Sequence, residues 1–320
     1  MPCILAECNE LDELKRFATT FVGIYVYHFV WDKLIISPIA TWLVRHKYML
    51  QAKRDKFRES MWKNAAVGTF FTFGLYIGLG EDWFMNPKGY FAEFPYVTPE
   101  PLRWYYMIYL SFWFQSVDFM LNITNKHYVV KRKDNAEMLV HHFATISLMV
   151  VSYAFDLTRI GICVLMIHDV NDLLLETAKI FMYVPCGPMA DIFFALFAIV
   201  WFIMRWFVYA KYIIYAVHTE GWNSIVVPIQ KAGGMGAFSA DTWYWFYIFF
   251  FSFLSLLLAL HVVWGYMIVK MVIRSLQEGK ADRDIRSDSE AEDEDDKPVA
   301  KKAEPATDSK VKRRRAPKAE

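Results

Sequence analysis

The sequence has few cysteines and few histidines, and each scarcity excludes a class of site. The four cysteines, Cys3, Cys8, Cys163 and Cys186, lack the spacing of a zinc site or a disulfide framework, and two of them lie in or beside apolar segments. Eight histidines with one adjacent pair are too few for the repeated histidine boxes of membrane di-iron hydroxylases and desaturases. We therefore expect no metal ion and no resident cofactor.

The N-terminus lacks the basic segment that precedes the apolar core of a cleavable signal peptide. Acidic residues Glu7, Glu10, Asp12 and Glu13 stand in its place, so we expect no such peptide. Apolar side chains, in contrast, are abundant: 56% of the 320 residues are hydrophobic and 18% are aromatic. This composition is too apolar for a water-soluble domain and indicates a membrane protein.

Charge is concentrated at the C-terminal end, although the formal net charge is only +1. Residues 282–296 hold nine acidic and two basic residues, a net −7, whereas residues 297–320 hold nine basic and three acidic residues, a net +6. Without apolar periodicity this tail cannot offset its ordering entropy, so residues 275–320 are predicted to be a disordered cytosolic tail. Acidic residues after Ser287 and Ser289 suit an acidophilic kinase, although a purely solubilising tail explains them equally well.

Seven segments are long and apolar enough to cross a bilayer, which takes about 20 residues. They are residues 17–44, 62–80, 102–121, 136–154, 160–183, 192–217 and 242–273. The predicted fold class is therefore all-α, a polytopic transmembrane helical bundle of about seven spans. We divide it into an N-terminal segment with the first span (1–55), a catalytic membrane domain of six spans (56–274) and the tail.

Basic residues in the short loops predict the orientation, because such residues stay on the cytosolic side. The loop at 45–63 and the loop before the fourth span are basic, whereas the loop at 81–103 is acidic. The N-terminus is therefore predicted to be lumenal and the C-terminus cytosolic. The glycosylation sequon at Asn122 then lies on the cytosolic side and is predicted to be unused.

Ionisable residues gather in the fourth and fifth spans, where their cost makes each a candidate for function. They are, with two polar neighbours, His141, His142, Thr145, His168, Asp169, Asn171, Asp172, Glu176 and Lys179. The connection at 155–159 is so short that the two spans must be antiparallel neighbours. Reflecting the numbering through this turn puts His141 level with Asp172, and His142 level with Asn171.

A histidine held against a buried carboxylate is one way to build a base, which could activate a hydroxyl or an amine. The alternative is that these polar groups only satisfy one another between helices. A haem held by His168 and one of the paired histidines is a further alternative, but three nearby acids would be an unusual surrounding for haem. The other histidines, including His218 and His261, are isolated and are interpreted as structural or interfacial.

The same residues resemble the longevity-assurance motif of ceramide synthases, within the TLC-domain superfamily. The resemblance covers roughly residues 56–270. The matching positions are His141-His142 with Thr145, Ser152-Tyr153, Arg159 with Gly161, His168-Asp169 with Asp172, Leu175-Glu176 and Ala178-Lys179. Two departures are the absence of the homeobox-like insertion of many animal members and the pair Val170-Asn171, where the family commonly has a Ser before the second Asp.

The resemblance implies an endoplasmic-reticulum enzyme that transfers a fatty acyl group from acyl-CoA to the amine of a sphingoid base. Carried over by position, His141, His142, Asp169 and Asp172 become the catalytic residues. One histidine would act as a general base or would accept the acyl group as an acyl-imidazole. Expected partners are acyl-CoA, the sphingoid base and membrane lipids, with a homo- or hetero-dimer possible and no nucleic acid. The alternative is a non-catalytic TLC-domain protein that binds or moves lipid or assists membrane-protein assembly.

Two further features bear on the substrates. The basic residues at 53–58 and 131–133 could attract the phosphates of CoA, although topology and attraction to anionic lipids explain them equally well. Acyl chain length would be set by the depth and lining of the pocket, including the lumenal loop predicted at 221–240.

Overall fold

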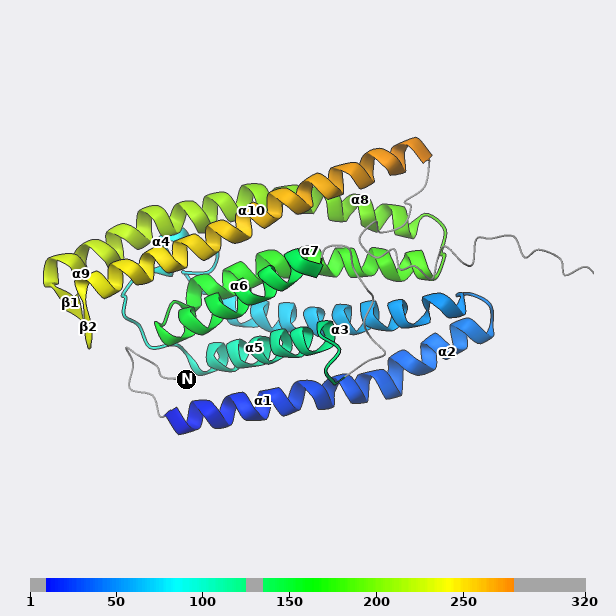
Figure 1. The fold of residues 1–320 in the computed structure, drawn as a ribbon, viewed down its shortest axis with the longest axis horizontal. Coiled ribbons are helices and arrows are strands. Elements are labelled where there is room, and N and C mark those ends of the chain that lie inside the picture. The colour runs from blue at the N-terminus through cyan, green and yellow to red at the C-terminus, as the bar shows by residue number, and fades with distance from the viewer. Residues whose placement is uncertain (1–9, 125–134, 279–320) are drawn as a thin grey trace, which may run out of the picture. The chain divides into compact units, whose positions relative to one another are not determined.

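The computed structural model of the chain describes residues 10–124 and 135–278 (Figure 1). These residues are almost entirely helical, which confirms the all-α prediction. The helices are α1 (Glu10–Trp31), α2 (Ser37–Arg45), α3 (Arg54–Gly78), α4 (Pro87–Tyr90), α5 (Glu100–Met120), α6 (Asn135–Ala154), α7 (Thr158–Tyr183), α8 (Met189–Trp201), α9 (Val227–Ala232) and α10 (Ala240–Glu278). Two-residue strands β1 (Gly234–Met235) and β2 (Phe238–Ser239) pair as a small antiparallel hairpin.

Each of the seven predicted segments overlaps a long helix or a continuous helical run, and the third, fourth and fifth segments match theirs to within about two residues. The helices of the first and second segments begin seven and eight residues earlier than predicted, and those of the sixth and seventh end fifteen and five residues later. Two of these, at 189–232 and 240–277, are long and apolar enough to cross a membrane by length and composition. The predicted tail begins inside α10, and residues 279–320, with Ser287 and Ser289, lie outside the described residues. The basic residues 131–133 also lie outside them.

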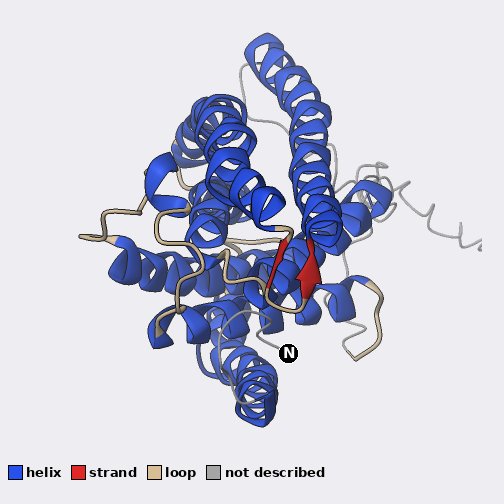
Figure 2. Cartoon of the chain, turned by 90° about the vertical axis from the view of Figure 1, so that its left-hand side faces the viewer, coloured by secondary structure: helices blue, strands red, loops and turns tan. Residues whose placement is uncertain are grey.

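Helix α7 is the central element of the described residues. It packs against α3, α5, α6 and α8 and against the π-helical segment η3 (Phe202–Ile214). Helix α10 packs against both α6 and η3, which themselves pack against α7, and so covers one face of this group of helices. Figure 2 shows the same helices from the end that carries the β1–β2 hairpin. The polar residues of the predicted site therefore lie on the two helices that face the middle of the bundle.

The helical run from α8 to α9 is wider than an ordinary α-helix, and its sequence explains why. Residues buried at every fourth position run through it: Phe197, Trp201, Arg205, Tyr209, Ile213, Val217, Gly221, Ile225 and Ile229. An α-helix has 3.6 residues per turn, so a strict period of four would drift around it. Two π-helical segments, η3 and η4 (Val217–Val226), keep this line of residues on one face.

The sequence prediction for this region was wrong in one respect. It ended the sixth segment at Val217 and placed a lumenal loop at 221–240. The helix instead continues to Ala232, where Gly233 ends it in the left-handed conformation at φ 80°. The ring of Phe91 packs against Gly221, where an added Cβ would lie 3.3 Å from it. A glycine here allows close packing and does not end the helix.

The charge inside the first predicted segment has a partner on α3. Helix α1 continues through a π-helical turn, η1 (Asp32–Ile36), into α2. The carboxylate of Asp32 accepts hydrogen bonds from Nε of Arg58 at 3.1 Å and from Nη2 at 2.8 Å. This bidentate pairing of two largely buried side chains lets an acidic residue lie within an otherwise apolar helix.

The turn between α6 and α7 is fixed by Asp156, which is 1% exposed and lies at φ 54°. The hydroxyl of Thr98 donates to its Oδ1 at 2.8 Å, and that hydroxyl oxygen is 3.0 Å from the hydroxyl of Thr158. Burial raises the pKa of the Asp156 carboxyl above its ordinary value. The charged form of this carboxylate therefore lowers the free energy of unfolding, although its Oδ1 accepts the hydrogen bond that fixes the turn.

We expect Asp156→Asn to stabilise the protein at neutral pH. Asparagine keeps the accepting oxygen and tolerates the left-handed conformation, but it carries no charge. The pKa of the Asp156 carboxyl is higher in the folded state than in the unfolded state, where it is about 4. The free energy of unfolding therefore falls as the pH rises from about 4 to the pKa of the folded state, because the unfolded protein releases this proton first. The unfolding temperature should rise by about 2–4 °C at pH 7, and the gain should vanish below pH about 4. An equal gain for the exposed Asp82→Asn would contradict this explanation.

Candidate functional site

The four predicted site residues line one cavity. This polar cavity lies between α3, α5, α6, α7, α8 and α10, and the empty space there, open solvent included, amounts to about 1430 Å³. His141 and His142 reach it from α6, and Asp169 and Asp172 reach it from α7. The short turn at 155–157 places these two helices side by side, as the sequence predicts. All four side chains therefore face the interior of the bundle.

His142 is oriented by its own helix. Its Nδ1 donates to the carbonyl oxygen of Met138 at 2.6 Å, because a carbonyl can only accept. In the neutral ring, this bond leaves the lone pair on Nε2. The indole of Trp113 on α5 packs edge-on against the His142 ring at 5.1 Å between centroids. The ring is thus held in one tautomer and one orientation.

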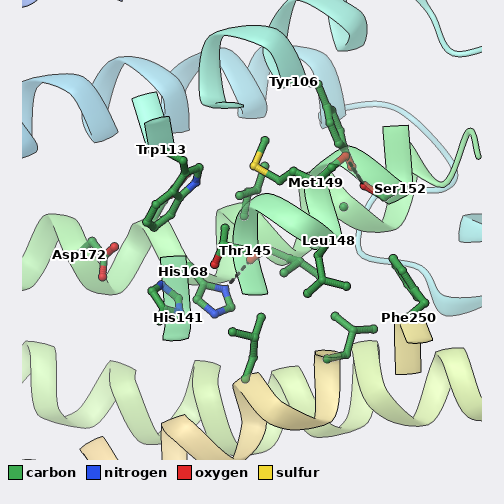
Figure 3. Close-up of a pocket in the computed structure, with 16 residues that line it drawn as sticks. Tyr106, Trp113, His141, Thr145, Leu148, Met149, Ser152, His168, Asp172 and Phe250 are labelled. Atoms are coloured by element: carbon green, nitrogen blue, oxygen red, sulfur yellow. Dashed lines mark hydrogen bonds between the residues drawn. The ribbon is translucent and has the colours of Figure 1, made fainter. Parts of the chain in front are cut away.

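His141 is also buried, and it is held mainly by aromatic rings. It is 8% exposed, and the rings of Trp113 and Trp264 pack edge-on against it at 5.5 and 5.3 Å. Its Nδ1 is buried and has no hydrogen-bond partner among the described residues. Figure 3 shows its ring beside that of His168, with 6.5 Å between the centroids. His141 therefore offers a ring nitrogen that the fold does not use.

The two aspartates are held by residues from other helices. Asp169 accepts a hydrogen bond from the hydroxyl of Tyr109 on α5, while its Oδ2 is buried without a partner among the described residues. Asp172 forms an ion pair with Arg205, with 3.2 Å between Oδ1 and Nη2. The side chain of Asp172 is 42% exposed, which places its carboxylate against the open space of the cavity.

These contacts change the predicted arrangement in one respect. The sequence suggests a histidine oriented directly by an aspartate, yet Asp169 and Asp172 are held by Tyr109 and Arg205. His168, which could reach Asp172 by helical spacing, turns elsewhere. Its Nδ1 donates to the carbonyl of Val164 at 2.7 Å, and its Nε2 lies 3.0 Å from Nε2 of His261 on α10. Both ring nitrogens of His168 are thereby used, which argues against a haem ligand at this position.

Arg205 and His261 belong to the site but escape the sequence prediction. Arg205 is 3% exposed and joins three elements: Nη2 donates to the carbonyl of His168 at 3.2 Å, and Nη1 lies 3.2 Å from Nε2 of His261. Its guanidinium also lies over the ring of Trp201 at 4.6 Å. A lone arginine within an apolar segment is the signal that could have revealed it, because such residues usually face a bundle interior.

Glu176 and Lys179 continue the polar face of α7 beyond Asp169 and Asp172, toward the C-terminal end of the helix. They form a buried ion pair of 3.1 Å, three residues apart on the same helix. Glu176 also lines the polar cavity, as do Glu59 and Lys63 at the start of α3, which pair with each other. This end of the cavity therefore presents charges of both signs.

A second, largely apolar cavity meets the first at the site. This middle cavity is lined by Leu148, Leu254 and Leu257 among others, and the empty space there, open solvent included, amounts to about 610 Å³. Residues common to both cavities are Trp113, His141, Asp169 and Asp172. His142, in contrast, lines only the polar cavity. Asp169, Asp172 and His141 thus lie at the junction of the polar cavity and the apolar middle cavity.

Comparison with known proteins gives a consistent picture. The TLC-domain family model (TRAM, LAG1 and CLN8) matches residues 56–270. Ceramide synthase LOH2 of Arabidopsis thaliana is 32% identical over 282 residues, covering 85% of this chain and 90% of the relative. Ceramide synthase 1 LOH3 of the same plant is 29% identical, covering 88% and 91%, and human ceramide synthase 4 is 31% identical, covering 77% and 57%. The chain therefore belongs to the ceramide synthase family of TLC-domain enzymes.

Proposed function

We propose that this enzyme transfers a fatty acyl group from acyl-CoA to the primary amine of a sphingoid base, forming a ceramide or dihydroceramide and free CoA. We place it in the endoplasmic reticulum membrane with seven spans, a lumenal N-terminus and a cytosolic C-terminus. The observation that carries the proposal is the junction of the two cavities. His141, Asp169 and Asp172 line both the polar and the apolar space.

The two cavities fit the two parts of the substrates. Acyl-CoA and a sphingoid base each combine a polar head with a long alkyl chain. The polar cavity, with Lys63 and Arg205, suits head groups, and the middle cavity suits an alkyl chain. The thioester carbonyl would then lie at the junction, beside His141. A lipid carrier needs no buried histidine with an unused nitrogen at that point.

The sphingoid nitrogen loses two protons in the reaction. The ammonium first gives one proton to a histidine, and the freed amine forms a bond to the thioester carbonyl carbon. The nitrogen loses its second proton as the carbon–sulfur bond breaks; one of the two protons passes to the departing sulfur, so that CoA leaves as a thiol, and the other passes to water. In the covalent variant His141 first attacks the carbonyl and releases CoA, and the amine then takes the acyl group from the acyl-imidazole.

The position of the two histidines supports a division of roles. His141 stands at the junction and is the residue placed to meet the carbonyl carbon. His142 lines the polar cavity only, with Nδ1–H on the Met138 carbonyl and its lone pair on Nε2, which suits a base for the ammonium. Asp169 and Asp172 supply negative charge that stabilises a protonated imidazole nearby.

Purified protein incubated with sphinganine and palmitoyl-CoA tests the proposal. We expect an N-palmitoyl product by mass spectrometry and an equal amount of free thiol, with no product when palmitic acid replaces the thioester. Lack of amide with every acyl-CoA tried would contradict the proposal. Omission of the amine separates the two routes, because an added palmitoyl mass on the peptide that contains His141 is expected only for the acyl-imidazole.

A further inference from the structure

A third cavity lies beyond the middle cavity, toward the β1–β2 hairpin. This far cavity is lined by Leu157, Gly221, Trp243 and Phe246 among others, and the empty space there, open solvent included, amounts to about 360 Å³. Phe250 on α10 lines the far cavity and also the middle cavity. The side chain of Phe250, 5% exposed, is therefore a wall between two apolar spaces.

The middle cavity has a closed end opposite His141. There the hydroxyl of Tyr106 accepts a hydrogen bond from Ser152 and donates to the carbonyl of Thr158, both at 3.3 Å. Figure 3 shows Tyr106 and Ser152 together at one side of the cavity, with Phe250 below them and His141 at the other side. The cavity thus runs from the site to a wall made by Tyr106 on one side and Phe250 on the other.

These two parts of the wall are held in different ways. Tyr106 is fixed by its hydrogen bonds and by its approach to Gly161, where an added Cβ would lie only 1.6 Å from the hydroxyl oxygen. Phe250 makes ring contacts instead: it stacks on Phe246 at 6.2 Å, and Phe246 packs on Phe155 at 3.9 Å. Phe250 can therefore be shortened without leaving a buried polar group unpaired.

Helical rise gives the length of each space. Ser152 follows His141 by 11 residues on α6, which corresponds to about 16 Å. An extended alkyl chain advances about 1.25 Å per carbon, since carbon–carbon bonds measure about 1.5 Å. The middle cavity therefore holds a chain of about 14 carbons, the carbonyl carbon included, when the thioester carbonyl lies at His141. The seven residues from Phe250 back to Trp243 add about 10 Å, or about eight carbons.

We propose that Phe250 determines acyl-chain specificity by closing the middle cavity against the far cavity. The occupant is the alkyl chain of the acyl thioester, so this inference rests on the proposed function. With Phe250 in place the enzyme accepts acyl groups of about 14 carbons. Without its ring the two cavities join, and chains of about 22 carbons fit.

The test compares Phe250→Ala with Phe249→Ala. Phe249 is the preceding residue on the same helix, but its ring packs on Phe253 at 4.3 Å and it lines none of the three cavities. Each variant receives sphinganine with equal amounts of acyl-CoA of about 14 and of about 22 carbons. We expect Phe250→Ala to raise the ratio of the longer to the shorter amide product at least about tenfold, and Phe249→Ala to leave this ratio unchanged. An unchanged ratio in Phe250→Ala would overturn the inference.

A second variant acts in the opposite direction. Leu148 lies seven residues after His141 and lines the middle cavity, so Leu148→Phe should shorten the usable space to about 9–10 carbons. We expect it to favour decanoyl-CoA over tetradecanoyl-CoA. An unchanged preference for the 14-carbon chain would contradict the inference that the length of the middle cavity limits the acyl chain.

A binding measurement separates this inference from the proposed function. Thermal stabilisation of each variant by the same two acyl-CoA thioesters, without amine, reports chain binding even if no amide forms. We expect the longer thioester to stabilise Phe250→Ala more than the wild-type protein. If binding follows this order while turnover is absent, the proposed reaction fails and the assignment of Phe250 stands.

Discussion

Replacing His141 by alanine should lower the rate of amide formation by at least about 10³-fold, the upper part of the range for a group that transfers a proton or forms a covalent bond. His141 stands between the polar and the middle cavity, and its Nδ1 has no partner within the described parts of the chain. Its removal therefore takes away the reacting group but breaks no hydrogen bond of that nitrogen. The initial rate with palmitoyl-CoA and sphinganine, divided by the amount of folded protein, measures the effect.

His218→Ala is the matched control for this variant. His218 is exposed in η4 and lines none of the cavities described above, so its loss should change the rate by less than about twofold. A rate above one tenth of the wild-type value in His141→Ala would remove His141 from the reaction. A large loss in both variants would indicate a general effect on the fold.

Replacing Arg205 should lower both the free energy of unfolding and the rate of amide formation, and these two effects can be measured independently. Arg205→Met leaves the carboxylate of Asp172 without its ion pair and removes a donor to the carbonyl of His168. We expect a cost of about 2–4 kcal/mol, below the range for a fully buried pair, because Asp172 is 42% exposed toward the cavity. The free energy of unfolding in detergent measures this cost.

The double variant Arg205→Met/Asp172→Asn resolves the two effects. It removes both charges, so most of the lost stability should return, whereas amide formation should remain at least about 10²-fold below wild type. Recovery of the rate together with the stability would mean that the pair serves only the fold. Arg205→Lys should keep the ion pair but not the simultaneous contacts with His168 and His261, since a single ammonium lacks the planar fork.

Much of the site could be predicted because its central residues lie on neighbouring helices joined by a very short turn. Such a turn fixes which helices pack together and gives their register to about one turn. The reflected numbering put His141 level with Asp172, and the ring of His141 lies beside His168, one helical turn away. The spacing of polar residues along α7 was therefore enough to bring the acids to the same cavity.

The rest depends on contacts between distant segments. Arg205 and His261 come from helical segments that are far apart in the sequence and whose register against α7 no local pattern gives. The partners of the aspartates were missed for the same reason, because Tyr109 and Arg205 arrive from α5 and η3. The extension to Ala232 was missed because a period of four does not fit the 3.6-residue pattern used to recognise helices.

One line of buried residues along the helical run from α8 to α9 contributes both to the charged layer of the site and to the lining of the far cavity. Arg205 and Gly221 belong to the same four-residue line, the first at the charged layer and the second on the wall of the far cavity. One inserted or deleted residue between them would rotate everything downstream by about 100° while leaving the guanidinium in place. Variation in chain length within η3 and η4 would thus re-line the far cavity, without touching any residue that meets the reacting carbonyl.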